Sequence, residues 1–410
     1  MQRLFAPRAG REPLACEVTP LPPALNFAFR FIAGYTFHLP PAAYQGTTPE
    51  WSVLAAITPE SGGTTYFVGR TLLSEALRTG AGFDVRGLYF LGEGRYSVEA
   101  TIRDNRSRVC RKQWQVVVEP SRIDRMVPLA MPPNSVGVFS PSIPPDAPLH
   151  DQAAPIRLSI LLNAAAFSTR RTTIQAFDRA VLLGALTTLL EHLPASSVRL
   201  VVFSLEQQRE VFRSDHVTPA DVDKAAAAIL ALQQATVDVH VLEKPQGHIE
   251  FLAGLLGRER AAPDPADTIV FLGATSRYGD KIPENALPAP SEAGPRFFYV
   301  RYESLRRATP TPDIPGVFPT DVGANPGKSG AAPETPGTAA SQNGSTARLP
   351  TTPGKGGSGR ANVYAPPPSD GPVGQNDIIA SAVSRLKGKT LTVHNPADLA
   401  NAIRKIEGKR

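Results

Sequence analysis

Three polar side chains of different chemistry lie at the ends of predicted elements. Asn163 and Asp280 follow apolar runs that have the length of buried strands, and His248 stands at the start of a predicted helix. Asn163 ends the run RLSILLN, His248 lies in KPQGHIEFLAGLL, and Asp280 ends TIVFLGATSRYGD. An amide, an imidazole and a carboxylate brought together could bind a small ligand or transfer a proton. The alternative for Asn163 is an amide that is hydrogen-bonded within the protein and caps its strand.

Basic side chains follow two of the same runs. The segment STRRT contains Arg170 and Arg171, and TSRYGDK contains Arg277, Tyr278 and Lys281. In α/β sheets the loops beyond the carboxyl ends of the strands share a crevice. We therefore expect a cationic rim that favours acidic side chains or phosphate without a metal. Solvated surface arginines are the alternative interpretation.

Several other motifs lack the context that their chemistry needs. GANPGKS at 323–329 resembles a phosphate-binding loop, but Val322 stands where the spacing requires glycine. GKGGSGR at 354–360 also has no strand before it. Two cysteines and scattered histidines argue against a zinc cluster. No Gly-x-Ser-x-Gly elbow follows a strand, so the sequence predicts no serine hydrolase.

The elements that position these residues alternate between strands and helices. Such alternation is typical of a doubly wound α/β sheet. The stretch 209–217 follows its neighbour too closely for a crossover helix, so we expect an antiparallel edge strand there. The expected strands are 156–162, 198–205, 267–273 and 296–302, and the expected helices are 172–193, 219–234 and 248–259.

The earlier part of the chain has a different period. Residues 27–119 contain short runs of alternating polarity, separated by turn residues at spacings near ten. This pattern predicts an immunoglobulin-like β-sandwich. We interpret residues 1–26 as an N-terminal extension and the Pro-rich residues 120–154 as a linker.

The α/β region is predicted to be interrupted. Residues 155–305 form its first part, and residues 306–375 are rich in Pro, Gly, Ser, Thr and Ala with few large apolar residues. Such a segment cannot bury enough surface to order itself. Residues 376–410 read as a helix, a strand and a helix, too small to fold alone. We expect them to complete the sheet and 306–375 to be a disordered insertion.

In strand order and in these local stretches, residues 155–305 and 376–410 resemble a von Willebrand factor A-like domain of the divergent bacterial "VWFA-related" type, which often follows a β-sandwich. Metal-binding members carry Asp-x-Ser-x-Ser, a Thr and a later Asp, whose oxygens hold Mg²⁺ or Mn²⁺. The resemblance places Asn163, Ala165, Phe167, His248 and Ala274 at those positions. It therefore implies a degenerate adhesion site that binds no metal.

Composition limits the cellular setting. A net charge of +6 and a pI near 9.4 suggest anionic partners only weakly. We expect no membrane span, and no signal peptide is visible in the chain. Cys16 and Cys110 flank the predicted sandwich. They could form a disulfide in an oxidising compartment, or they could be two buried thiols.

The leading hypothesis is a non-catalytic protein-interaction module, secreted or associated with the envelope, with no cofactor. We expect its partner to be a protein and not a nucleic acid, and the basic side chains favour a partner with acidic groups. One alternative is an enzyme or small-ligand binder that uses the crevice around Asn163, His248 and Asp280. Another is a structural component of an envelope or secreted assembly.

Overall fold

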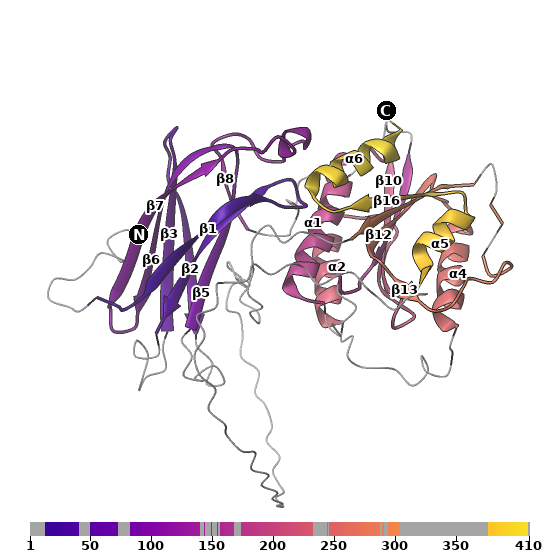
Figure 1. Cartoon of the computed structure of the whole chain (residues 1–410), viewed down its shortest axis with the longest axis horizontal. Coiled ribbons are helices and arrows are strands. Elements are labelled where there is room, and N and C mark those ends of the chain that lie inside the picture. The colour runs from indigo at the N-terminus through magenta and orange to yellow at the C-terminus, as the bar shows by residue number, and fades with distance from the viewer. Residues whose placement is uncertain are drawn as a thin grey trace, which may run out of the picture. The chain divides into compact units, whose positions relative to one another are not determined.

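The computed structural model combines a β-sandwich with a mixed α/β region (Figure 1). None of the helices in the described part of the chain is long and apolar enough to cross a membrane. The predicted insertion 306–375 lies outside the described residues. The structure describes residues 13–40, 50–72, 83–139, 156–167, 174–232, 246–287, 294–303 and 376–408, with 143, 149, 154, 244, 289 and 290.

Two four-stranded antiparallel sheets form the sandwich. Inward side chains alternate along each strand; in β6 they are Tyr96, Val98, Ala100 and Ile102. They meet large buried residues of the facing sheet in one apolar core. The first sheet has the order β1 (Glu17–Leu25), β2 (Phe31–Leu39), β5 (Phe83–Leu91), β8 (Val136–Val138); the second has β4 (Thr65–Leu72), β3 (Glu50–Pro59), β6 (Gly94–Asp104), β7 (Val109–Val118).

The sandwich extends beyond the predicted 27–119 at both ends. β1 lies within the predicted N-terminal extension, and β8 lies within the predicted linker, which also holds a short 3-10 helix at Asp124–Met126. The run EVTPLPPAL contains three prolines, which lack the N–H that a central strand must donate. β1 tolerates them because it is the end strand of its sheet, and its register shifts between Leu21 and Ala24.

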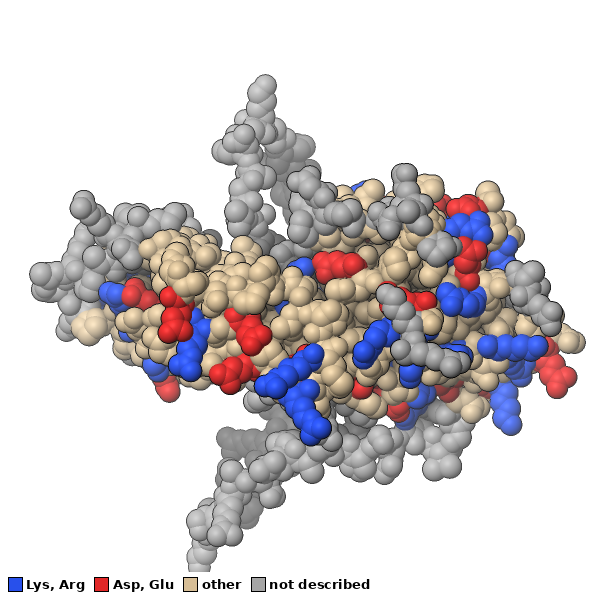
Figure 2. Space-filling view, turned by 90° about the horizontal axis from the view of Figure 1, so that it is seen from above, with Lys and Arg blue, Asp and Glu red and all other residues tan. Residues whose placement is uncertain are grey.

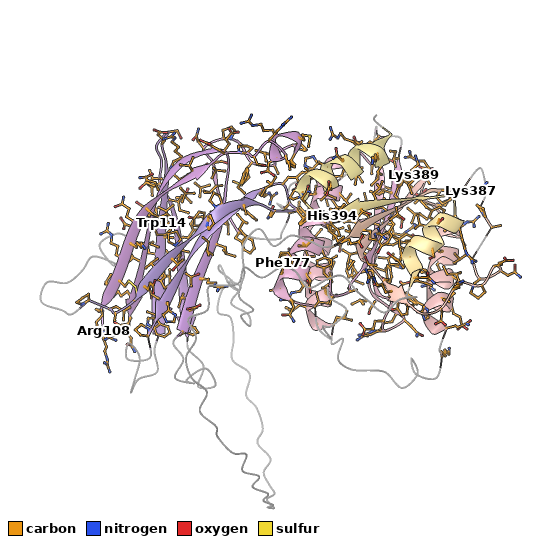
Figure 3. All side chains as sticks on the ribbon, in the orientation of Figure 1. Arg108, Trp114, Phe177, Lys387, Lys389 and His394 are labelled. Carbon is orange, nitrogen blue, oxygen red and sulfur yellow. A yellow bond between two sulfur atoms is a disulfide. The ribbon has the colours of Figure 1, made fainter. Side chains whose placement is uncertain are left out.

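Cys16 and Cys110 form a disulfide with Cα atoms 6.2 Å apart. Cys16 directly precedes β1 and Cys110 lies in β7, so the bond joins the two sheets. Nearby, Lys112 Nζ donates to the Val18 carbonyl at 2.7 Å. On the same strand, Trp114 meets the ring of Tyr35 edge-on, with centroids 6.1 Å apart (Figure 3).

The α/β region is built on a six-stranded sheet. Four of its neighbouring pairs are parallel, and β11 pairs antiparallel with β10. The strands, in order across the sheet, are β11 (Arg209–Ser214), β10 (Ser197–Ser204), β9 (Arg157–Asn163), β12 (Thr268–Ala274), β14 (Arg296–Tyr302) and β16 (Lys389–Val393).

Helices cover both faces of this sheet (Figure 1). In β9, Ile160 and Leu162 enter one apolar cluster with α1, α2 and α6, whereas Leu161 enters a second cluster with α4 and α5. A strand that is buried on both faces reads as a continuous apolar run, as this one does. The helices are α1 (Ala176–His192), α2 (Pro219–Ala231), α4 (Gly247–Arg260), α5 (Ile378–Arg385) and α6 (Pro396–Glu407).

Local signals fix the helix starts. Thr218 precedes α2, and its backbone N–H donates to Asp221 Oδ2 at 3.0 Å in a capping box. Asn395 caps α6 by accepting from the Asp398 N–H at 3.0 Å. α1, α2 and α4 therefore correspond to the helices predicted at 172–193, 219–234 and 248–259.

Residues 376–408 are integrated into the α/β sheet. β16 pairs in parallel with β14, and β15 (Asn376–Asp377) pairs with β13 (Arg277–Tyr278). His394, directly after β16, places Nδ1 2.6 Å from the Glu303 carbonyl oxygen (Figure 3). Gly388 is required by close packing, since a Cβ there would lie 2.6 Å from the Phe297 carbonyl oxygen.

The turn after β1 belongs to the core of the α/β region. Phe29 is fully buried in the same apolar cluster as α1, at a φ of 53°. Thr188 Oγ1 donates to the Phe27 carbonyl at 2.7 Å, and Arg30 Nη2 pairs with Glu191 at 3.0 Å. The described parts of sandwich and α/β region thus belong to one compact unit.

Candidate functional site

The amide of Asn163 is used inside the protein. Its Nδ2 donates to Ser276 Oγ at 2.8 Å, and its Oδ1 accepts from the Leu205 N–H at 3.3 Å. The side chain is 1% exposed. These bonds tie together the carboxyl ends of β9, β10 and β12. Asn163 therefore caps its strand, as the second of the two interpretations from the sequence has it.

Three of the other positions at which the resemblance places metal ligands make ordinary packing contacts or hydrogen bonds. The Ala165 N–H donates to the Asn163 carbonyl at 3.0 Å, and the Phe167 ring lies 5.8 Å from that of Tyr302. The buried Ala274 offers its carbonyl to the Tyr299 hydroxyl at 2.6 Å. Among the residues that the structure describes, no three His, Cys, Asp or Glu side chains are grouped so that they could hold a metal ion.

His248 lies in the first turn of α4 and stacks on Tyr278, with ring centroids 4.2 Å apart. The imidazole is 4% exposed. Its Nε2 lacks a hydrogen-bond partner in the described part of the chain and lies 3.7 Å from Asp280 Oδ2. Burial lowers the pKa of His248, and the Asp280 carboxylate partly opposes that shift. The ring is therefore held neutral near pH 7.

Glu206 follows β10 at the same edge. Although the residue is exposed, partial desolvation raises the pKa of its carboxyl group. Burial, and to a lesser extent the Glu206 charge, raises the pKa of Tyr278. Sequence reasoning missed Glu206 and Ser276, although both come within two residues of a strand's carboxyl end. That position is the signal that would have found them.

The structure places the residues of the predicted cationic rim in different surroundings from one another. Arg277 Nη2 lies 4.0 Å from a Glu303 carboxylate oxygen, so an acid that directly follows β14 balances its charge. Tyr278 is engaged with His248 and does not form a rim. Lys281 is exposed, whereas Arg170 and Arg171 lie outside the described residues.

Charges of both signs are mixed on one face of the molecule. Lys and Arg alternate with Asp and Glu on the face shown in Figure 2. At the carboxyl edge, Arg301 pairs with Glu303 at 3.1 Å and with Asp377 at 3.6 Å. On this face, neighbouring charges of opposite sign partly offset one another.

Among the described residues at this edge, Ser276 and His248 Nε2 form no hydrogen bond with each other. The Ser276 hydroxyl accepts from the Asn163 amide, and the His248 ring contacts Tyr278 and Asp280. A serine nucleophile needs its base within hydrogen-bond reach. The structure brings together Asn163 with Ser276, and His248 with Tyr278 and Asp280, as two separate groups.

No protein-family model and no curated protein matches this chain. Among solved structures, it is similar to a conjugative transposon lipoprotein from Bacteroides eggerthii at 14% identity, covering 24% of this chain and 93% of that one with a TM-score of 0.16. A conjugate transposon protein from Bacteroides vulgatus aligns at 15% identity over 27% and 91%, with a TM-score of 0.17.

A β-glucuronidase from Bacteroides uniformis aligns at 8% identity, covering 71% of this chain and 36% of that one, with a TM-score of 0.19.

Proposed function

We propose that this chain is a non-catalytic protein-binding module in which a β-sandwich accompanies a metal-free von Willebrand factor A-like domain. The carrying observation is the use of Asn163, whose amide donates to Ser276 Oγ and accepts from the Leu205 N–H within the protein. A mostly parallel sheet with helices on both faces supports the doubly wound assignment. Because one fold can carry many activities, the proposal that the chain is non-catalytic rests on the contacts of Asn163 and not on the fold.

The Cys16–Cys110 disulfide supports a location outside the cytoplasm. Disulfides persist in oxidising compartments and are rare where thiols are kept reduced. We therefore place the module in the periplasm, in the envelope or in the secreted fraction.

Lys281 at the carboxyl edge is the group we assign to the partner contact. It is exposed, and it follows the strand β12 by seven residues in a loop where crevice-lining groups lie. An acidic side chain of a partner would satisfy it. Rim charges of this kind act mainly on the association rate and on its salt dependence.

A photo-crosslinking residue in place of the exposed Gly279, which leaves Lys281 intact in the full chain, tests this proposal in extract of the native organism. The expected result is one discrete protein adduct that is weakened by added salt. An excess of the unlabelled parent chain should compete the adduct away, and an excess of Lys281→Glu should not. A matched residue in place of the exposed Arg95 in β6 should give none. Adducts that form equally from both positions would overturn the assignment of the surface.

One observation favours the alternative of a small-ligand site, namely the unpartnered Nε2 of His248. A ligand there would form a hydrogen bond with Nε2 of the imidazole. Under the proposed function, His248→Phe leaves binding of the protein partner unchanged because the ring stack is kept. Loss of partner binding in His248→Phe, with partner binding kept in Lys281→Glu, would favour the ligand site.

A further inference from the structure

A cavity of about 450 Å³ lies at the opposite, amino edge of the α/β sheet. Four arginines from four different elements line it, and two aspartates complete its charged lining. The arginines are Arg157 of β9, Arg199 of β10, Arg213 of β11 and Arg258 of α4, and the aspartates are Asp215 and Asp264.

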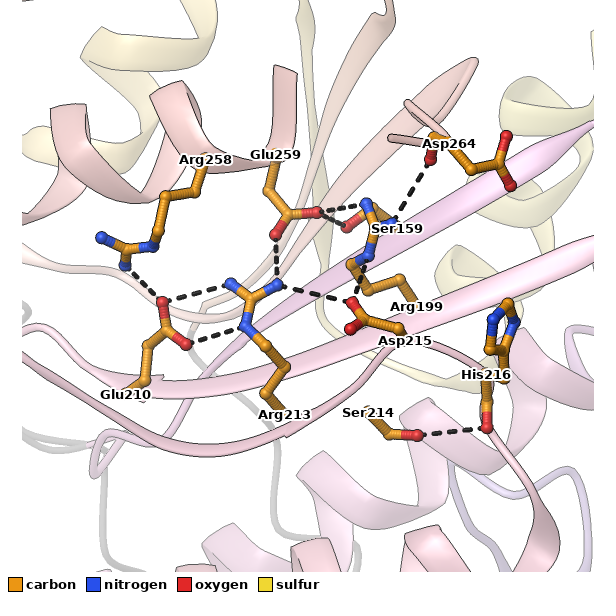
Figure 4. A network of polar contacts seen from close by, with 10 residues as sticks. All are labelled: Ser159, Arg199, Glu210, Arg213, Ser214, Asp215, His216, Arg258, Glu259 and Asp264. Carbon is orange, nitrogen blue, oxygen red and sulfur yellow. Dashed lines mark hydrogen bonds and ion pairs between the residues drawn. The ribbon is translucent and has the colours of Figure 1, made fainter. Parts of the chain in front are cut away.

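A buried carboxylate contacts two of these arginines (Figure 4). Glu259 is fully buried at its side chain and accepts from Ser159 Oγ at 2.7 Å. It also accepts from Arg213 Nη1 at 2.9 Å and from Arg199 Nη1 at 3.3 Å. Because a buried charge is stable only when it is paired, Glu259 holds the two guanidiniums in place.

The two aspartates are held far less firmly. Asp215 binds Arg199 Nε at 2.7 Å and Asp264 binds Arg157 Nη1 at 2.7 Å, yet their side chains are 59% and 53% exposed. Exposed ion pairs contribute little, because water screens them. Each aspartate thus places a carboxylate where an external oxyanion could sit, and each can move away into solvent.

Exchange would free Arg157 Nη1 and Arg199 Nε, the donors that the two aspartates now occupy. Arg157 keeps its bonds from Nε and Nη2 to Asp267, at 3.0 and 2.7 Å. A guanidinium carries five N–H donors in a planar fork that fits the oxygens of phosphate and carboxylate. Arg258 is 54% exposed and donates through Nη2 to Glu210. Ser197 and His216 add a hydroxyl and an imidazole to the lining.

Two features oppose an anion at this edge. The last turn of α4, which carries Arg258, directs its carbonyl groups here. Asp215 and Asp264 also repel a second negative charge. Glu210, Glu259 and Asp267 also pair with these four guanidiniums, so five carboxylates share the cluster with them. An anion can therefore bind only by displacing Asp215 and Asp264, which makes these aspartates the groups that limit affinity.

We propose that the cavity binds a small soluble molecule bearing a phosphate or sulfate group, whose oxygens replace the carboxylates of Asp215 and Asp264 on Arg199 and Arg157. Nothing in this inference depends on the protein-binding function assigned to the other edge of the sheet. The volume exceeds that of a lone phosphate, so the anion is one end of a larger ligand.

Calorimetric titration of the full chain with inorganic phosphate tests the proposal. Asp215→Asn removes the competing charge and keeps the side-chain shape. It should tighten phosphate binding by up to roughly fivefold, the equivalent of one exposed ion pair. Arg258→Gln should weaken binding by a similar factor. Both residues are exposed, so both variants are expected to fold. Arg95→Gln in the sandwich is the control and should bind like the parent.

The comparison of phosphate affinities between the variants decides the test, because phosphate also stabilises proteins that have no specific phosphate site. Phosphate binding that is absent from both the parent and Asp215→Asn would overturn the proposal. So would equal affinity in the parent, Asp215→Asn and Arg258→Gln. A sulfate titration with the same order of affinities would extend the ligand class to sulfate esters, and the opposite order would contradict it.

Discussion

The imidazole of His248 and the phenol ring of Tyr278 lie face to face, with centroids 4.2 Å apart and planes inclined by 13°. The two residues come from the start of α4 and from β13. Their stack removes the imidazole from water and leaves Nε2 facing Asp280 at 3.7 Å. A proton on this ring would therefore gain one partially exposed partner and lose its hydration.

The stability of the protein should depend on the protonation of His248. Its folded-state pKa lies below the ordinary value of about 6.5, because burial disfavours the charged ring. As the pH falls through about 6.5, His248 takes up a proton in the unfolded chain but stays neutral in the folded protein. The free energy of unfolding therefore falls as pH is lowered. His248→Phe keeps a stacked ring that cannot titrate, and should lose less stability between pH values of about 7.5 and 5.5.

Chemical denaturation of both proteins at the two pH values measures this difference. The raised pKa of Glu206 acts in the opposite sense, since its folded state takes up a proton more readily, and His192 acts in the same sense as His248. Both groups are present in both proteins, so their contributions cancel in the comparison. An equal loss of stability in the two proteins would contradict the assignment.

Replacing Asn163 with aspartate should not create a metal site. The change removes the Nδ2 donor to Ser276 and buries a carboxylate at a position that is 1% exposed. We expect a loss of about 3–5 kcal/mol, typical of an unpaired buried charge. Millimolar Mg²⁺ or Mn²⁺ should leave the melting temperatures of parent and variant unchanged, because a ligand without a site cannot stabilise the native state.

Asn401→Asp on α6 is the matched control, since Asn401 already accepts from Arg404 and a carboxylate there keeps that bond. It should melt close to the parent. A rise in melting temperature with Mg²⁺ that EDTA reverses would show that the domain binds metal after all.

The disulfide should contribute about 2–4 kcal/mol to stability by restricting the unfolded chain. Cys16 and Cys110 are 94 residues apart in sequence, so the bond closes a long loop. Cys16→Ala with Cys110→Ala should lower the denaturation midpoint by the same amount as reductant lowers that of the parent. Reductant should have no effect on the double variant. Two titratable thiols in protein purified under oxidising conditions would refute the bond.

Cleavage within 306–375 should leave the two fragments associated. β16 pairs with β14 in register, and α5 buries Ile378, Ile379 and Val383 in the apolar cluster beneath the sheet. Limited proteolysis followed by native gel filtration should give one peak that contains both fragments, and denaturant should separate them. Separation under native conditions would contradict the prediction.

Strands buried on both faces were predictable because their signal is local. The runs at 156–162, 198–205, 267–273 and 296–302 became β9, β10, β12 and β14, with side chains that alternate between two apolar clusters. β1 was missed because three prolines argue against a strand until its place at the end of the sheet is known.

The site was less predictable because its contacts are distant in sequence. Asn163 and Ser276 are 113 residues apart, and Ser159 and Glu259 are 100 apart. Glu259 lies in the charged run GRERAAPDPAD, which reads as solvated surface. Only the sheet order brings its helix end to the amino edge of β9, where the carboxylate becomes buried.

The parallel pairing of β14 with β16 also affects the protein while it is being made. A nascent chain that has emerged to residue 303 exposes the edge of β14, with Phe298, Val300 and Tyr302, until residue 393 follows. At ordinary translation rates that interval lasts on the order of ten seconds. An apolar strand edge left open for so long is a target for chaperones and for misassembly on the ribosome. Ribosome stalling between these residues should therefore yield a species that chaperones retain.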